Sequence, residues 1–309
     1  GTEKGWKSLA DAGLPAMFYV SKLDEEHANF FNTFDSLRDI FGASVIPFTF
    51  PILHGEEAVG VVDLVSKKAY DVSGKEIALP AEEKIEEYMA ELNEQVAETD
   101  EALMEKFFME EPFTEEELLK GIKEGIRQRS VTPVFCGCAM NGLGTAALLD
   151  NLVRFAPSPL EGKPAVRVDE EGKETEFPLN PDGPATAFVF NTVADQYGKN
   201  SYFKVLSGSI EDTMTVVNAR TGDNEKLGNT FFPKGKDNAK TAKVCCGDIG
   251  VFTKLASVRT GDTLCQPGKL VTIKPMTYAE PCYRMAIYAK TKGQEDKVAA
   301  GLVKLNEED

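Results

Sequence analysis

The 309-residue sequence lacks the patterns of a metal site, a secretory leader and a membrane span. It has only two histidines, and its six cysteines include no C-x-x-C pair, so neither residue type indicates zinc ligands. The cysteines lie in or beside apolar runs typical of strands, which predicts buried free thiols in a reducing compartment. No apolar run reaches about 18 residues, and the first residues do not form a basic and apolar leader. We therefore expect a cytoplasmic protein with no membrane partner.

Basic residues are scarce as well: 34 Lys and Arg face 50 Asp and Glu, which gives a formal net charge of −16. This balance argues against a general nucleic-acid binder. The excess of acidic residues is local. Residues 81–124 hold sixteen acids against four lysines, whereas residues 184–268 hold eight acids against ten basic residues. The acidic stretch is either a solvated surface or a docking site for a basic partner.

A short apolar run, Met17 to Val20, precedes the polar loop Ser21-Lys22-Leu23-Asp24, and apolar residues at helical spacing then continue up to Gly42. A strand, a loop and a helix make half of a βαβ unit, and ligands bind at the carboxyl ends of such strands. An Asp carboxylate can accept two parallel hydrogen bonds from the N–H groups of guanine, while a Lys stem lies along the base. The alternative is that Asp24 is an ordinary N-cap.

The pattern changes after this helix. Alternation over residues 44–72 predicts an antiparallel meander. Helical spacing then begins at Ile85 with a break near Asp100, and Thr114 with Glu117 forms a capping box that opens a further helix.

The strand and helix pattern returns with the buried run Val131 to Cys138 and a helix from Gly144 that is stopped by Pro157. The segment between the two βα patterns is therefore interpreted as an insertion. Gly142-Leu143-Gly144-Thr145 is interpreted as the loop that enters the last helix, because it lacks the Lys and the spacing of a phosphate-binding loop.

The length predicts about two domains, and the second half differs from the first. Residues 160–183, rich in Pro, Gly and acids, are interpreted as a linker. Short β runs with Gly- and Asp-containing turns follow, and they predict a closed or nearly closed barrel. Residues 282–289 and 294–305 predict one strand and one helix, too little to bury their own apolar face. We expect these last residues to begin another domain, and the first strand to lie in a sheet cut by the start of the chain.

In this order, the segments resemble elongation factor G, a translational GTPase. Ser21-Lys22-Leu23-Asp24 is similar to the family's Asn-Lys-x-Asp guanine motif, and Gly137-Cys138-Ala139 is similar to its Gly-Ser-Ala loop. Further similarities lie in the barrel and after it, at Val205 to Ile210, Gly247 to Gly250, Thr260 to Leu264 and Ala289 to Lys292.

The resemblance implies an α/β plus β fold: a partial doubly wound GTPase-domain sheet with an inserted α+β subdomain, followed by a translation-factor β-barrel. The implied domains are the end of the GTPase domain, the insert, a linker, the barrel and the start of a third α+β domain, at residues 1–43 with 128–158, 44–127, 159–183, 184–280 and 281–309.

The resemblance also implies the site. Asp24 recognises guanine, Lys22 packs on the base, and the backbone N–H of Ala139 meets the guanine carbonyl. Two residues depart from the family pattern: Ser21 replaces an Asn and so removes an amide, and Cys138 replaces a Ser with a weaker hydrogen-bonding group. We expect guanine preference to be retained with a less standard loop.

Phosphoryl transfer needs groups that this sequence does not contain. No G-x-x-x-x-G-K-[ST] motif is present to hold the phosphates and Mg²⁺. The resemblance implies GTP or GDP with Mg²⁺ in a longer parent enzyme, whereas for this part alone we expect no bound cofactor, no catalytic residue and no hydrolysis.

The resemblance implies a fragment that binds the ribosome and promotes translocation of tRNA and mRNA. The barrel would contact small-subunit rRNA, with Lys234, Lys236, Lys240 and Lys243 as candidates or as an ordinary solvated turn. The acidic insert would face the large-subunit stalk protein. Open alternatives are a ribosomal protection or release-type factor, a ribosome-binding adaptor that does not hydrolyse GTP, and an unrelated α/β binding protein.

Overall fold

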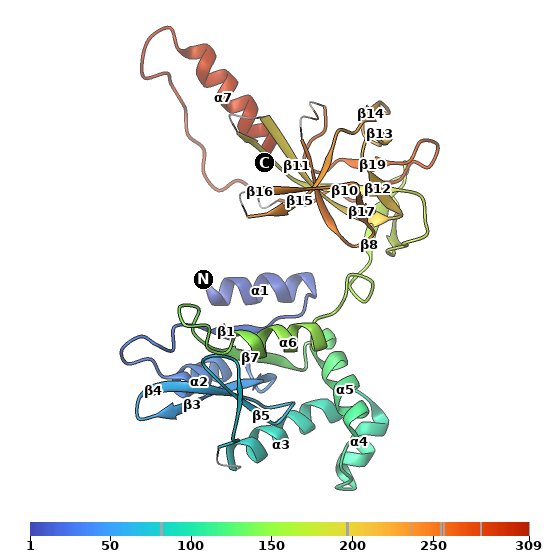
Figure 1. Ribbon diagram of the computed structural model, residues 1–309. Helices are drawn as coiled ribbons and strands as arrows, with labels where there is room; N and C mark the ends of the chain where they lie inside the picture. Colours follow the sequence, from blue (N-terminus) through green and yellow to red (C-terminus); the bar gives the residue numbers. More distant parts are fainter. Residues whose placement is uncertain are drawn as a thin grey trace. The chain divides into compact units, whose positions relative to one another are not determined.

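The structure is a computed structural model with two compact units, Gly1–Pro157 and Ser158–Asp309 (Figure 1). It describes residues 1–80, 83–195, 198–235, 237–253, 255, 257–278 and 280–308.

The first unit contains a three-stranded parallel sheet in the order β1-β7-β2. The strands of the two βα patterns are neighbours: β1 (Phe18–Val20) lies beside β7 (Thr132–Cys136) and parallel to it. The third strand, β2 (Val45–Pro47), corrects the sequence interpretation, which placed it in the antiparallel meander. All three residues of β2 are buried, as in a strand covered on both faces, and so short a buried run shows no alternation that would distinguish it.

Helices α1 (Thr2–Ala12), α2 (Phe30–Phe41) and α6 (Thr145–Phe155) belong to the same unit, and α2 and α6 lie close to their predicted ranges. The C-cap of α2 is Gly42, as expected from the sequence.

The meander itself is a four-stranded antiparallel sheet, followed by three helices. Its strands are β3 (Thr49–His54), β4 (Glu57–Asp63), β5 (Lys68–Asp71) and β6 (Glu76–Ile77). The helices are α3 (Glu83–Ala97), α4 (Glu101–Phe108) and α5 (Glu115–Gln128). The predicted break is confirmed by Asp100, which caps α4, and the predicted capping box is present at Thr114 and Glu117.

The meander and its helices share one hydrophobic core with the parallel sheet. Phe48, between β2 and β3, packs edge-on against Phe135 of β7 and Phe155 of α6, with ring centroids 5.8 and 5.7 Å apart. The buried carboxylate of Asp63 accepts a 2.6 Å hydrogen bond from the amide of Asn151. The insertion therefore packs as a continuation of the sheet's core.

The second unit is built on an eight-stranded antiparallel sheet that curves as a half-barrel (Figure 1). Its strands, in spatial order, are β14 (Asn224–Lys226), β13 (Thr215–Asn218), β19 (Thr263–Cys265), β10 (Thr186–Asp195), β11 (Gly198–Ser207), β18 (Ile249–Thr253), β15 (Thr230–Lys234) and β16 (Asp237–Thr241). A separate pair, β12 (Ser209–Glu211) with β17 (Lys243–Cys245), completes the β structure over the same core.

Stacked aromatic rings lie at the centre of this core. The rings of Phe203 and Phe252 are 3.8 Å apart and nearly parallel. Gly250 leaves room for them, because a Cβ at that position would come within 2.5 Å of the Phe203 ring.

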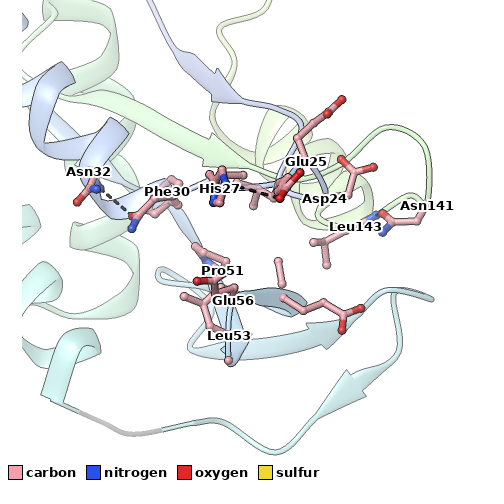
Figure 2. Close-up of a pocket in the computed structure, with 17 residues that line it drawn as sticks. Asp24, Glu25, His27, Phe30, Asn32, Pro51, Leu53, Glu56, Asn141 and Leu143 are labelled. Atoms are coloured by element: carbon pink, nitrogen blue, oxygen red, sulfur yellow. Dashed lines mark hydrogen bonds and ion pairs between the residues drawn. The ribbon is translucent and has the colours of Figure 1, made fainter.

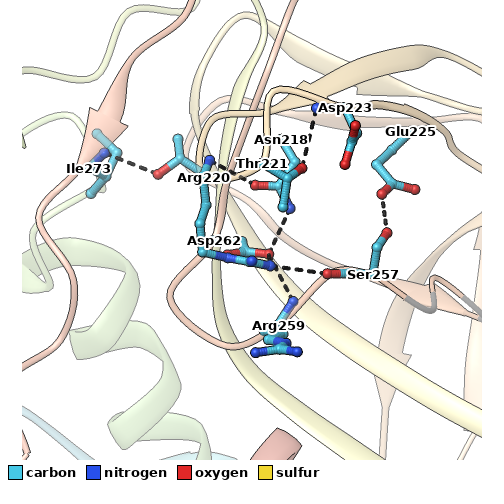
Figure 3. Close-up of polar contacts among 10 residues, drawn as sticks. Asn218, Arg220, Thr221, Asp223, Glu225, Ser257, Arg259, Asp262 and Ile273 are labelled. Atoms are coloured by element: carbon cyan, nitrogen blue, oxygen red, sulfur yellow. Dashed lines mark hydrogen bonds and ion pairs between the residues drawn. The ribbon is translucent and has the colours of Figure 1, made fainter.

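A buried carboxylate, Asp262, ties its own loop to the turn after β13 in the half-barrel (Figure 3). It accepts hydrogen bonds from Arg220 at 2.7 and 3.0 Å, from the amide of Asn218 at 2.7 Å and from the backbone N–H of Arg259 at 2.9 Å. Burial alone would raise the pKa of Asp262, but these donors outweigh it and hold the pKa below its ordinary value.

The linker expected from the sequence is corrected by the structure, which has β strands in that segment. Residues 160–183 contain a hairpin of β8 (Ala165–Val168) and β9 (Glu174–Phe177), and β20 (Thr272–Ile273) adds a third strand to it. The side chain of Asp169 forms the turn by accepting hydrogen bonds from the N–H groups of Glu171 and Lys173. The polar composition that suggested a linker belongs to this turn and to the exposed face of the hairpin.

The end of the chain agrees with the sequence only in part. Helix α7 (Glu295–Glu308) is present, but the strand predicted at residues 282–289 is wrong, because those residues form no strand. Tyr283, Met285 and Tyr288 are largely exposed. An alternating run becomes a strand only beside another strand, and the described part of the chain pairs none with it.

Candidate functional site

Two loops leave the carboxyl ends of adjacent parallel strands and meet. The register places Val20 beside Cys136, so the loops after β1 and β7 begin side by side. The N–H of Gly137 donates to the carbonyl of Val20 at 3.1 Å, and the N–H of Leu23 donates to the carbonyl of Gly137 at 3.5 Å. This is the edge of an open α/β sheet at which ligands bind.

The first loop presents polar groups around one buried anchor. Leu23 is buried, whereas Ser21, Lys22 and Asp24 are exposed. Lys22 has a left-handed backbone, with φ of 64°, and its ammonium lies 3.5 Å from a carboxylate oxygen of Glu25. Its long stem is therefore free of the core and available to a flat ligand.

Asp24 is not the helix cap. Helix α2 is capped by Asn29, whose side-chain oxygen accepts a hydrogen bond from the N–H of Asn32 at 3.0 Å. Asp24 instead lines an open cavity of about 680 Å³, whose other walls include the β3–β4 turn (Figure 2). Its carboxylate is thus placed to accept hydrogen bonds from a bound molecule.

The second loop turns its cysteine inward and its alanine outward. Cys138 is buried, its N–H donates to the carbonyl of Leu143 at 3.0 Å, and its carbonyl accepts from Gly142 at 3.0 Å. Ala139 is exposed at the tip of the loop. The thiol of the neighbouring Cys136 is fully buried, which raises its pKa to about 12, so it is unreactive at neutral pH.

Gly137 is the point of closest approach between these loops. A Cβ added there would lie 2.2 Å from the carbonyl oxygen of Leu143 and 2.6 Å from the hydroxyl of Tyr19. We expect Gly137→Ala to destabilise the first unit by about 1–3 kcal/mol, the range of overpacked positions. The measurement is urea unfolding followed by fluorescence of the single tryptophan, Trp6, which stacks on Phe18 in this unit.

The matched control is Gly5→Ala in α1, where an added Cβ meets nothing within 4 Å. This change should leave the urea midpoint unchanged or raise it, because Ala favours helix. Equal midpoints for Gly137→Ala and wild type would contradict the packing described for the loop.

The cavity gathers fewer of the predicted site residues than expected. Of the five, Asp24 lines it, whereas Ser21, Lys22, Cys138 and Ala139 are not among its lining residues. The sequence interpretation missed the other polar lining residues: Glu25, Glu26, His27, Asn29, Asn32, Glu56, Glu57 and Asn141. The only available signal was position, since Asn141 comes two residues after the Gly-Cys-Ala loop and Glu56 lies in a strand turn that faces the site.

Three of the four lysines proposed for the barrel lie in described strands of the second unit. Lys234 ends β15, and Lys240 and Lys243 are in β16 and β17. The ammonium of Lys240 is 3.9 Å from Asp212, and that of Lys243 is 3.7 Å from Glu211. Acidic neighbours thus offset two of the candidates. Lys236 lies outside the described residues.

Two features are absent from the described residues. No cluster of three or more His, Cys, Asp or Glu has the arrangement of a metal site. No helix among them has both the length and the apolar composition needed to cross a membrane.

Known proteins with similar sequences and structures cover all or part of this chain. The profile described as elongation factor G domain 2 matches residues 184–267. Elongation factor G 1 of Methylococcus capsulatus (strain Bath) is 32% identical over 319 aligned residues, which cover 100% of this chain and 46% of that protein. The chain is thus similar to elongation factor G along its whole length. A crystal structure of a protein from Thermus thermophilus is similar with a TM-score of 0.82 and 26% identity, covering 100% of this chain and 45% of that one.

The chain thus spans about half the length of the elongation factor G relative it matches. The half-barrel from β10 to β19 is the part that the domain 2 profile covers.

Proposed function

We propose that this chain is the guanine-binding and ribosome-binding part of an elongation factor G-like GTPase that promotes translocation of tRNA and mRNA. The observation that carries the proposal is the junction of the two loops at the sheet edge, where Leu23 donates to Gly137 and Asp24 faces an open cavity. The similarity to elongation factor G supports the same role.

The groups present fit a guanine base. The carboxylate of Asp24 can accept hydrogen bonds. Ala139 is exposed at a loop tip, and the side chain of Lys22 is solvated. A site built on such polar contacts rejects a base that lacks them by about 10⁴–10⁵-fold, because its own groups would be left unpaired. In the complete enzyme, GTP with Mg²⁺ would supply the phosphoryl group; the residues of this chain would hold and select the base.

The charge distribution supports two further contacts. The strongly acidic residues 81–124 would face the large-subunit stalk protein, and the half-barrel would contact small-subunit rRNA. With these contacts the ribosome would be the partner of the protein, in the cytoplasm.

Calorimetric titration of GDP, with ADP as the control, tests the proposal in the protein expressed from its complete reading frame. We expect micromolar or tighter binding of GDP and rejection of ADP. Binding of neither nucleotide would remove the guanine site from the proposal.

Ser21 favours one alternative, a ribosome-binding adaptor that does not hydrolyse GTP. The serine removes the amide that the family motif carries, and its side chain is exposed. Ribosome-stimulated GTP hydrolysis separates the two functions: an adaptor would bind ribosomes without releasing phosphate. A protection or release-type factor would differ in the ribosomal step that its hydrolysis drives.

A further inference from the structure

Asn141 has an amide whose orientation is fixed by the loop that carries it. Its side-chain oxygen accepts a 3.0 Å hydrogen bond from the N–H of Leu143. Because a backbone N–H can only donate, the oxygen must face it and the NH₂ group must point elsewhere. Within the described part of the chain, that NH₂ group makes no hydrogen bond, and the side chain lines the same cavity as Asp24 (Figure 2).

Guanine offers two kinds of group along its edges. The ring N–H and the exocyclic amine donate, and O6 and N7 accept. A carboxylate such as Asp24 complements the donors, and a backbone N–H at Ala139 complements O6. The acceptor N7 then still needs a donor.

We infer that Asn141 supplies this donor, its amide NH₂ binding N7 of guanine, and that it is a base-binding residue of the site. The inference rests on the proposed guanine site. It assigns to the loop after β7 the amide that is absent at Ser21, where the serine hydroxyl is exposed.

The other amides of the cavity have different surroundings. Asn29 is the N-cap of α2, so its side chain is bound to the helix end. Asn32 lies within the first turn of α2, on the wall formed by that helix. Only Asn141 among these three lies on the loop that also presents Ala139.

The test compares GDP with 7-deaza-GDP, in which a C–H replaces N7, in the protein expressed from its complete reading frame. The key variant is Asn141→Asp, which keeps the oxygen that accepts from Leu143 but has no amide donor. Its added charge affects both nucleotides alike, so the readout is the ratio of the two affinities. Asn141→Ala is the second variant, and Asn32→Ala is the matched control within the cavity.

We expect wild type and Asn32→Ala to bind GDP about tenfold more tightly than 7-deaza-GDP, the size of one neutral hydrogen bond. Asn141→Asp and Asn141→Ala should bind the two nucleotides equally. A tenfold preference that persists in both Asn141 variants would overturn the inference while leaving the guanine site intact. Failure of wild type to bind GDP at all would overturn both, and equal binding of the two nucleotides by wild type would overturn the inference alone.

Discussion

Replacing Asp24 by alanine is expected to weaken GDP binding by about 10²–10⁴-fold in the protein expressed from its complete reading frame. The carboxylate is proposed to accept two hydrogen bonds from the base, and a hydrogen bond to a charged group contributes about 1.5–3 kcal/mol. The change should leave the fold intact, because Asp24 is exposed and Asn29 caps the helix. Calorimetry with GDP measures the loss, and the Trp6 unfolding curve checks the fold.

A second substitution turns the prediction into a change of specificity. Asn at position 24 accepts one hydrogen bond and donates another, so it complements xanthine, which has a carbonyl where guanine has its amine. The Asp24→Asn variant should therefore lose affinity for GDP and gain affinity for xanthosine diphosphate. Glu56→Gln, which removes another carboxylate from the same cavity, should change neither affinity more than about threefold, the scale of an exposed charge pair. Unchanged GDP binding by Asp24→Ala would exclude Asp24 as the base-binding residue.

Replacing Asp262 by alanine should destabilise the second unit by about 3 kcal/mol. Removing one partner of a buried ion pair typically costs about 3–5 kcal/mol, and the lower end applies because the Arg220 side chain is 46% exposed and stays solvated. The amide of Asn218 and the N–H of Arg259 would also lose their acceptor. Hydrogen exchange resolved by segment is the measurement, and β10, β13 and β19 should lose protection.

The two units provide an internal control for Asp262→Ala. Trp6 reports on the first unit, so the fluorescence transition should stay at the wild-type urea concentration. Asp223→Ala removes an exposed carboxylate near the same turn and should leave exchange unchanged. Protection lost equally from both units would show that the effect is not local to the Asp262 network.

The same carboxylate predicts a dependence on pH. Because the folded state lowers the pKa of Asp262, its contribution to stability is complete above the ordinary Asp pKa of about 3.9 and is lost as the pH falls through the lowered value. The difference in exchange protection between wild type and Asp262→Ala should therefore be constant near neutral pH and shrink only in strong acid.

Local signals in the sequence predicted much of the first unit. The strands β1 and β7, the break at Asp100 and the capping box at Thr114 each depend on a few adjacent residues, and all of them are present in the structure, although β1 is only half-buried. The membership of β2 in the parallel sheet was missed, because it depends on pairing with residues almost ninety positions away in sequence, such as Val45 with Thr132.

Long-range pairing also explains the other misses. The hairpin of β8 and β9 lies in the segment whose composition suggested a linker, and its partner β20 lies in the range predicted for the barrel. Residues 282–289 have the alternation of a strand but lack a partner in the described part of the chain. Within the site, Asp24 was found through its motif, whereas Asn141 belongs to no motif and enters the cavity through the path of its loop.

The pairing of β20 with β8 determines how the second unit would carry a pulling force. The ladder is antiparallel, Ile273 lies opposite Arg167, and the N–H of Lys274 donates to the carbonyl of Val166. The polypeptide thus enters this sheet and leaves it at the same end. Tension between the chain before residue 165 and the chain after residue 274 would peel the ladder apart one hydrogen bond at a time. The eight-stranded half-barrel would bear load only after the β8–β20 ladder had separated.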